Sequence, residues 1–137
     1  MRITLLIAVT VLAFANLNGH ASIRRLQGVH HMDSLRGRTL RWTFTDGPMA
    51  GTLIEHAFHD DASVTWRILE GQGKGVAVRE KHFASMQVAD NVQMVSYLAA
   101  SGHTLTVGLN LATGRMFGFG SNDKEWLPMT GTFEVVQ

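Results

Sequence analysis

Hydrophobic and polar side chains alternate with a period of two along most of the chain after residue 37. Leu40, Trp42 and Phe44, for example, alternate with Arg41 and Thr43, which is typical of a half-buried β-strand. Clusters of Gly, Asp, Asn and Ser separate such segments. The expected strands cover residues 40–44, 52–58, 64–68, 76–88, 92–99, 105–111, 116–120 and 131–136. No stretch shows a capped 3.6-residue period, so crossover helices are not expected.

Eight short strands joined by a few turn residues predict an all-β, antiparallel fold. Closure into an up-and-down barrel removes the exposed edges of such a sheet with the shortest connections. An eight-stranded barrel is wide enough either to be filled by its own side chains or to hold one small ligand. A two-sheet sandwich is the structural alternative, and the absence of long Greek-key crossovers argues against it.

The N-terminus predicts a cleavable export signal. Arg2 precedes an uncharged apolar run from Ile3 to Ala15, and Gly19 and Ala21 place small residues before a cleavage site. The run has about 13 residues, too few for the about 20 that span a bilayer. We therefore expect a signal peptide at residues 1–21, a linker at 22–36 and one domain at 37–137, in a periplasmic or secreted protein. Retention of the leader as a membrane anchor is the alternative.

The amino-acid composition limits the classes of partner and cofactor that the protein is expected to bind. The 137-residue chain has a formal net charge of +1, which argues against nucleic acid or an anionic membrane as the main partner. It contains no cysteine, and its seven histidines lack metal-binding spacing. We expect no metal, no cofactor and, once the signal is removed, no membrane association. A homodimer is possible.

Several aromatic and ionisable residues lie within the expected strands, where they could line a cavity. An arginine and a glutamate among aromatic rings suit a small aromatic or acidic ligand. The alternative is a cross-strand ion pair on the surface, worth a few tenths of a kcal/mol. Alternation alone does not decide between them, because either face of residues 64–68 could point inward. The candidate ligand-binding residues are Trp42, Phe44, His56, Arg67, Glu80 and Tyr97.

Five segments, taken in order, resemble the MoaF-like domain family. They are residues 41–47 (RWTFTDG), 64–67 (VTWR), 79–81 (REK), 95–98 (VSYL) running into 105–107 (LTV), and 122–126 (NDKEW). The resemblance covers residues 37 to 136. It implies a calycin-like (lipocalin-type) barrel, and it implies no established reaction.

A more distant resemblance is to the phenolic acid decarboxylases, which share this kind of barrel. Their tyrosine-arginine pair corresponds to Trp66 and Arg67, and their catalytic glutamate lies near Glu80 or His82. Their substrate-binding tyrosine pair is replaced by Trp42 and Phe44, which have no phenolic hydroxyl. The comparison implies that Arg67, Trp42, Phe44 and Glu80 line the cavity, but it argues against the same decarboxylation.

We therefore expect an exported barrel that binds a small aromatic or carboxylate-bearing molecule. The alternative is a cofactor-free lyase or decarboxylase-like enzyme that uses Glu80 or His82 as a general base beside Arg67. The two differ in that only the enzyme would lose turnover in Glu80→Gln while it kept binding.

Overall fold

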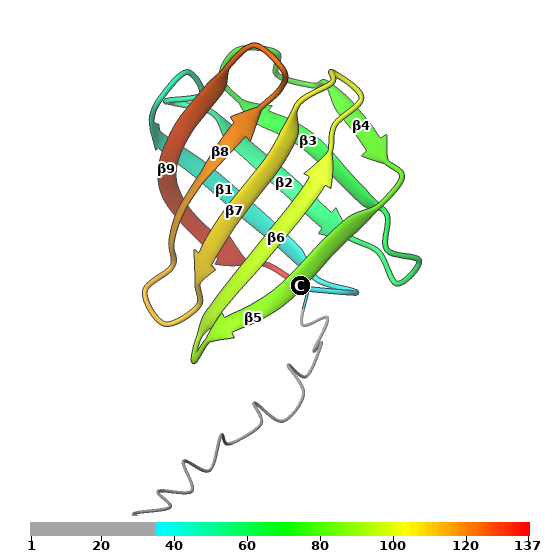
Figure 1. Cartoon of the computed structure of the whole chain (residues 1–137), viewed down its shortest axis with the longest axis vertical. Helices are drawn as coiled ribbons and strands as arrows, with labels where there is room; N and C mark the ends of the chain where they lie inside the picture. The colour runs from blue at the N-terminus through cyan, green and yellow to red at the C-terminus, as the bar shows by residue number, and fades with distance from the viewer. Residues whose placement is uncertain (1–34) are drawn as a thin grey trace, which may run out of the picture.

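The computed structural model describes residues 35–137, and the fold in this range is built from antiparallel β-strands (Figure 1). The signal peptide and most of the linker expected from the sequence lie outside the described residues. Within residues 35–137, no helix is long and apolar enough to cross a membrane. The nine strands are β1 (Thr39–Asp46), β2 (Leu53–Phe58), β3 (Val64–Glu70), β4 (Ala77–Glu80), β5 (Phe83–Ala89), β6 (Val92–Leu98), β7 (Thr104–Asn110), β8 (Arg115–Ser121) and β9 (Trp126–Val135).

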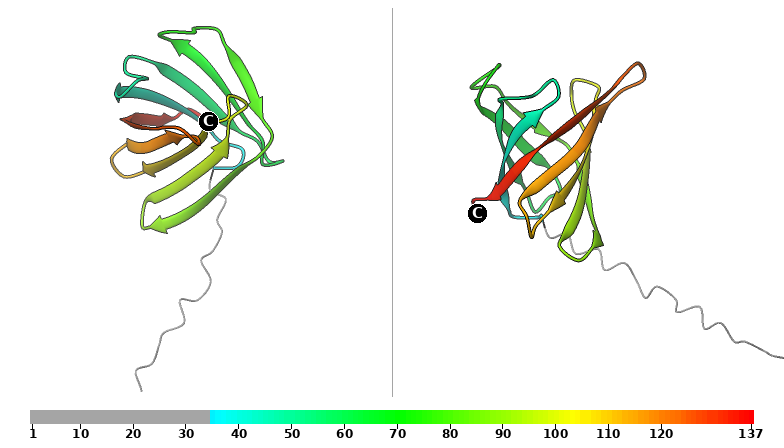
Figure 2. Two further views of the ribbon diagram at one scale, coloured as in Figure 1. Left: turned by 45° about the horizontal axis from the view of Figure 1, so that its top comes forward. Right: turned by 90° about the vertical axis from the view of Figure 1, so that its left-hand side faces the viewer.

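The strands form one sheet that curves into a nearly closed barrel (Figure 2). Their order in the sheet is β4-β3-β2-β1-β9-β8-β7-β6-β5. The first and last strands, β1 and β9, are therefore hydrogen-bonded neighbours. All other pairings join strands that are consecutive in the chain. The up-and-down barrel predicted from the alternation is confirmed.

The count of nine strands differs from the expected eight at one place. The single strand expected at residues 76–88 is two strands, β4 and β5, interrupted at Lys81 and His82. β4 pairs with β3, whereas β5 pairs with β6. The chain thus changes its partner at this break, and β4 and β5 together fill the position of one bent strand between β3 and β6. The amide of Phe83 donates to the carbonyl oxygen of Ala62 (2.7 Å), which ties the start of β5 to the β2–β3 turn.

Two inward glycines let neighbouring strands approach closely. A Cβ atom on Gly131 of β9 would overlap the carbonyl oxygen of Thr43 in β1, and one on Gly118 of β8 would overlap that of Thr106 in β7. Glycine at these positions allows the strands to coil tightly around the barrel. The β1–β9 register also shifts between Phe44 and Asp46, next to Gly131.

Side chains fill the end of the barrel where the β2–β3 and β7–β8 turns lie. Phe58 and Phe83 pack edge to face with their ring centroids 4.9 Å apart. Leu35, from the last part of the expected linker, is buried in the same core as Leu40. The amide of Gly37 donates to the carbonyl oxygen of Phe58 (2.7 Å), which holds this turn against the barrel. This end of the barrel is closed.

The outer face of β5 to β9 carries exposed apolar side chains. Phe117, Phe119 and Trp126 are 55%, 46% and 66% exposed, and the rings of Phe119 and Trp126 are in edge contact at 5.5 Å. β5, β6 and β7 contain no charged residue at all. This surface is therefore largely apolar, with the exposed charges of β8 and β9 confined to Arg115 and Glu134 near the strand ends, and we call it the β5–β9 face.

Candidate functional site

The opposite end of the barrel contains a cavity of about 280 Å³. It opens among the β1–β2, β6–β7 and β8–β9 connections, which lie at the top of Figure 1. Most of its wall is apolar or aromatic. The lining residues are Phe44, Pro48, Met49, Ile54, His56, Trp66, Ile68, Tyr97, Ala99, Ser101, His103, Leu105, Gly120, Leu127 and Met129.

The deepest part of the site is built from three rings on three strands. His56 of β2 is stacked on Trp42 of β1, with ring centroids 3.8 Å apart and an angle of 25° between the planes. On its other side, Nε2 of His56 is hydrogen-bonded to the hydroxyl of Tyr97 in β6 (3.1 Å). His56 and Tyr97 line the cavity, while Trp42 is fully buried behind His56. These side chains meet because alternate residues of each strand point into the barrel.

Burial keeps both polar rings uncharged. It lowers the pKa of His56 from 6.5 to about 3, and the nearby Ile54 backbone opposes this shift without forming a well-aligned hydrogen bond. Burial also raises the pKa of the Tyr97 hydroxyl, and the negative charge of Glu80 adds to the effect. At neutral pH the site therefore offers a neutral imidazole and a protonated phenol. Within the described residues, Nδ1 of His56 and Nε1 of Trp42 are buried without a hydrogen-bond partner.

Glu80 supports the cavity wall from behind. Its Oε1 accepts a hydrogen bond from Nε1 of Trp66 (3.0 Å), and its Oε2 accepts one from the amide of Ala100 (3.0 Å). Glu80 as a whole is only 4% exposed. It thus fixes a wall residue, Trp66, and the β6–β7 connection at the mouth in one arrangement.

A polar group lies at the rim. Nδ1 of His103 is 3.3 Å from the hydroxyl of Ser101, and its Nε2 is 3.1 Å from Nδ2 of Asn122. The carboxylate of Glu125 lies 3.5 Å from the same Nε2. These contacts link the β6–β7 and β8–β9 connections across the mouth of the cavity.

Five of the six residues expected to line the cavity point into the barrel, and they form two groups. Phe44, His56 and Tyr97 do line it. Trp42 and Glu80 point inward, but they lie behind the lining and support it.

Arg67 does not line the cavity, so this expectation is wrong. It is exposed and pairs in the sheet with Glu55, whose carboxylate binds Arg41 (3.0 Å) on the outer surface. His82, the other candidate base, is exposed at the break between β4 and β5, whereas Glu80 is buried at the end of β4. Strand alternation would put residues 80 and 82 on one face, and the break ends that alternation.

Sequence reasoning missed several lining residues, and Trp66 is the most informative of them. Val64 and Ile68 are buried, and Trp66 lies between them on the same side of β3. The run of apolar residues at 64, 66 and 68 was the signal that this side is the inner one. Trp66 also pairs directly with His56 in the sheet.

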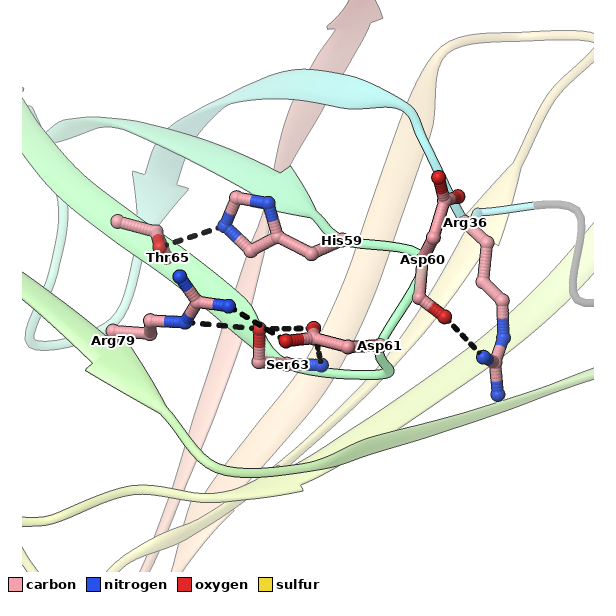
Figure 3. A network of polar contacts seen from close by, with 7 residues as sticks. All are labelled: Arg36, His59, Asp60, Asp61, Ser63, Thr65 and Arg79. Atoms are coloured by element: carbon pink, nitrogen blue, oxygen red, sulfur yellow. Dashed lines mark hydrogen bonds and ion pairs between the residues drawn. The ribbon is translucent and has the colours of Figure 1, made fainter.

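A separate polar network covers the closed end, around the β2–β3 turn (Figure 3). The hydroxyl of Ser63 donates to Oδ1 of Asp61 (2.5 Å), and Nη2 of Arg79 lies 2.7 Å from Oδ2 of the same carboxylate. The hydrogen bonds from the Ser63 side chain and backbone lower the pKa of Asp61 to about 2, and Arg79 adds to this. Nε2 of His59 contacts the hydroxyl of Thr65 instead (2.8 Å). The His59 ring therefore bonds to Thr65 and not to Ser63, and the network stabilises the turn.

The candidate catalytic residues do not meet in the cavity. Glu80, His82 and Arg67 do not share one site. Among residues 35–137, no three His, Asp or Glu side chains lie close enough together to hold a metal ion. What faces the cavity is a largely apolar wall with a neutral hydrogen-bonding pair at its depth and a polar rim.

The fold and the cavity define a small antiparallel β-barrel that is open at one end. The model of the MoaF N-terminal domain matches residues 21–122, so the chain belongs to the MoaF N-terminal domain family, in agreement with the resemblance found in the sequence. Among solved structures, the chain is similar to a protein titled a putative beta-lactamase from Burkholderia vietnamiensis, with a TM-score of 0.64 and 16% identity. The match covers 74% of this chain and 95% of that one, and it supports the fold alone. Comparison with curated protein sequences gives no match.

Proposed function

We propose that this domain binds a small, mainly apolar molecule in the cavity at the open end of the barrel. The observation that carries the proposal is the unfilled space itself, about 280 Å³ lined largely by apolar and aromatic side chains. Protein interiors normally close such spaces, so a persistent open cavity is a candidate binding site. Its size is just below the usual range of about 300–1,000 Å³ for ligand pockets, which favours a compound with one or two rings.

Of the two kinds of ligand expected from the sequence, an aromatic compound is favoured over a carboxylate-bearing one. Phe44, Trp66 and Tyr97 line the cavity and supply flat surfaces against which a ring can pack. Arg67, the cation expected to bind a carboxylate, lies outside the barrel. The alternative of a lyase loses support for the same reason, because its arginine and its two candidate bases do not meet in the cavity.

We also propose that binding takes place in the periplasm or outside the cell, because residues 1–21 have the pattern of a cleavable export signal. The absence of cysteine suits an oxidising compartment. N-terminal sequencing of the protein purified from its host should then begin at Ser22. A sequence that begins at Met1 would contradict export by cleavage.

A pair of matched substitutions tests the binding site. Ala99 is half-buried at the mouth of the cavity, so Ala99→Trp should block it. Ala84 is exposed on the outside of β5, and Ala84→Trp adds the same group without touching the cavity. We expect native mass spectrometry and calorimetry with a panel of one- and two-ring aromatic compounds to show binding to the wild type and to Ala84→Trp.

Binding should fall by about tenfold or more in Ala99→Trp, since the bulky indole competes for the ligand's space. If all three proteins bind equally, the ligands do not enter the cavity. If none binds any compound of the panel, the proposed function is wrong.

A further inference from the structure

We propose that the cavity selects an uncharged aromatic compound whose hydroxyl or carbonyl group hydrogen-bonds to Tyr97 at its depth. The inference rests on the proposed function and specifies its ligand. Two observations on the cavity lining support it. The hydroxyl of Tyr97 in the interior can form a further hydrogen bond, and the lining contains no Lys or Arg.

Tyr97 has a hydrogen bond to give or to accept. Its hydroxyl has one proton and two lone pairs, and the bond to Nε2 of His56 (3.1 Å) uses only one of these. If the hydroxyl donates to His56, its lone pairs can accept from a ligand. If it accepts from His56, its proton can be donated to a ligand. A neutral imidazole permits both arrangements, so the pair suits either a hydroxyl or a carbonyl group.

The other polar groups near the cavity are less suited to this role. Nε1 of Trp66 already donates to Glu80, and Nδ1 of His56 is buried away from the cavity surface. Ser101 and His103 lie at the mouth, where they contact each other. A polar group of a ligand that reaches the interior therefore meets the hydroxyl of Tyr97.

The surroundings disfavour an anion. The cavity lining contains no Lys or Arg, and the carboxylate of Glu80 lies directly behind Trp66. His56 resists protonation, because burial lowers its pKa to about 3. His103, at the rim, lies next to the carboxylate of Glu125. A buried carboxylate would lose its hydration without gaining a partner of opposite charge, which is costly.

Three ligands of one shape test the inference: 2-naphthol, naphthalene and 2-naphthoate, titrated into the full-length wild-type protein at neutral pH by calorimetry. We expect 2-naphthol to bind best, since it fills the cavity and adds one hydrogen bond. Naphthalene should bind about fivefold more weakly, the effect of one neutral hydrogen bond. The 2-naphthoate anion should bind at least about tenfold more weakly than 2-naphthol.

Tyr97→Phe removes the hydroxyl and keeps the ring. We expect it to lower the affinity for 2-naphthol to that for naphthalene, while the affinity for naphthalene itself stays within about twofold. Unchanged naphthalene binding serves as the control that the variant is folded with an intact cavity. The comparison of the three ligands on the wild type decides the question of charge without any variant.

The possible failures are distinguishable. If 2-naphthoate binds as well as 2-naphthol, the preference for an uncharged ligand is wrong, although the cavity still binds ligands. If Tyr97→Phe keeps the preference for 2-naphthol over naphthalene, the role of Tyr97 is wrong. If the wild type binds none of the three ligands, and Ala99→Trp does not weaken the binding of any compound of the wider panel, both this inference and the proposed function are wrong.

Discussion

His56 shows what a single residue in this chain does and how far the sequence could foresee it. Its position between Ile54 and Phe58, on the side of β2 that carries apolar residues, predicted an inward side chain, and all three are buried. Its contacts with Trp42 and Tyr97 depend on strands 14 and 41 residues away in the chain, so no local pattern could reveal them. The prediction that Arg67 lines the cavity was wrong for a related reason. Its own strand has apolar residues on both sides, so the local pattern does not show which side is the inner one.

The buried imidazole predicts an acid-sensitive fold. The pKa of His56 is about 3 in the folded protein and 6.5 in its ordinary state. Between these values the unfolded chain binds a proton that the folded one excludes, so the free energy of unfolding rises with pH across this window and falls on acidification. The contribution is at most about 1.4 kcal/mol per pH unit.

Urea denaturation of the wild type between pH 7 and pH 4 should therefore show a loss of stability that is smaller in His56→Gln. His82→Gln removes an exposed histidine and should leave the pH dependence of the wild type unchanged. Asp61, whose pKa is lowered to about 2, loses its contribution only at more acidic pH. If His56→Gln and the wild type have parallel profiles, the imidazole is accessible to protons in the folded state.

At the level of elements, alternation predicted most strands, and the turns fell where glycine and Asx clusters placed them. The break at Lys81 and His82 was not predicted. Residues 79–82 (REKH) are four polar residues in a row, which interrupts the alternation of the strand expected at residues 76–88, but this run does not show which strands pair on either side of it. What interrupts that strand is the change of partner from β3 to β6, which is a property of the closed barrel and not of the local sequence.

Glu80, the last residue of β4, joins β3 to the β6–β7 connection through its carboxylate, so its loss should destabilise the fold. Glu80→Ala would leave Nε1 of Trp66 and the amide of Ala100 without their acceptor. Since each is a hydrogen bond to a charged group, we expect a loss of about 3 kcal/mol in the free energy of unfolding, measured by urea denaturation. Glu134→Ala, on the exposed end of β9, is the control and should change stability by less than about 0.5 kcal/mol. Equal effects of the two substitutions would show that Glu80 does not hold the β6–β7 connection.

For the whole molecule, the barrel was predictable and its hollow upper half was not. Whether a barrel is filled depends on the summed volume of side chains from every strand. Here Gly120 and Ala99 line the cavity where larger residues would have closed it. The sequence alone left both outcomes open, since a filled barrel and a ligand-binding barrel share one alternation pattern.

The β5–β9 face predicts weak self-association through this surface. Together Phe117, Phe119 and Trp126 expose roughly 300 Å² of aromatic surface, and no charge on β5, β6 or β7 opposes contact with a second copy. A stable interface buries about 800 Å² per partner, so we expect a dimer only at high concentration. Sedimentation velocity should show a mass that rises with concentration in the wild type and less so in Phe119→Ser/Trp126→Ser. A wild type that stays monomeric at all concentrations would contradict this.

The bent β4–β5 segment has a consequence for how the chain could be reconnected. The two ends of the barrel domain meet where the amide of Thr39 donates to the carbonyl oxygen of Gln137 (2.8 Å), while β4 and β5 adjoin in the chain but pair with different strands. A circular permutant that joins these ends and opens the chain between Lys81 and His82 would therefore keep every strand pairing of the native sheet. In such a permutant the sheet would run from one terminus to the other without interruption, and the present position of the chain ends would become an ordinary hairpin.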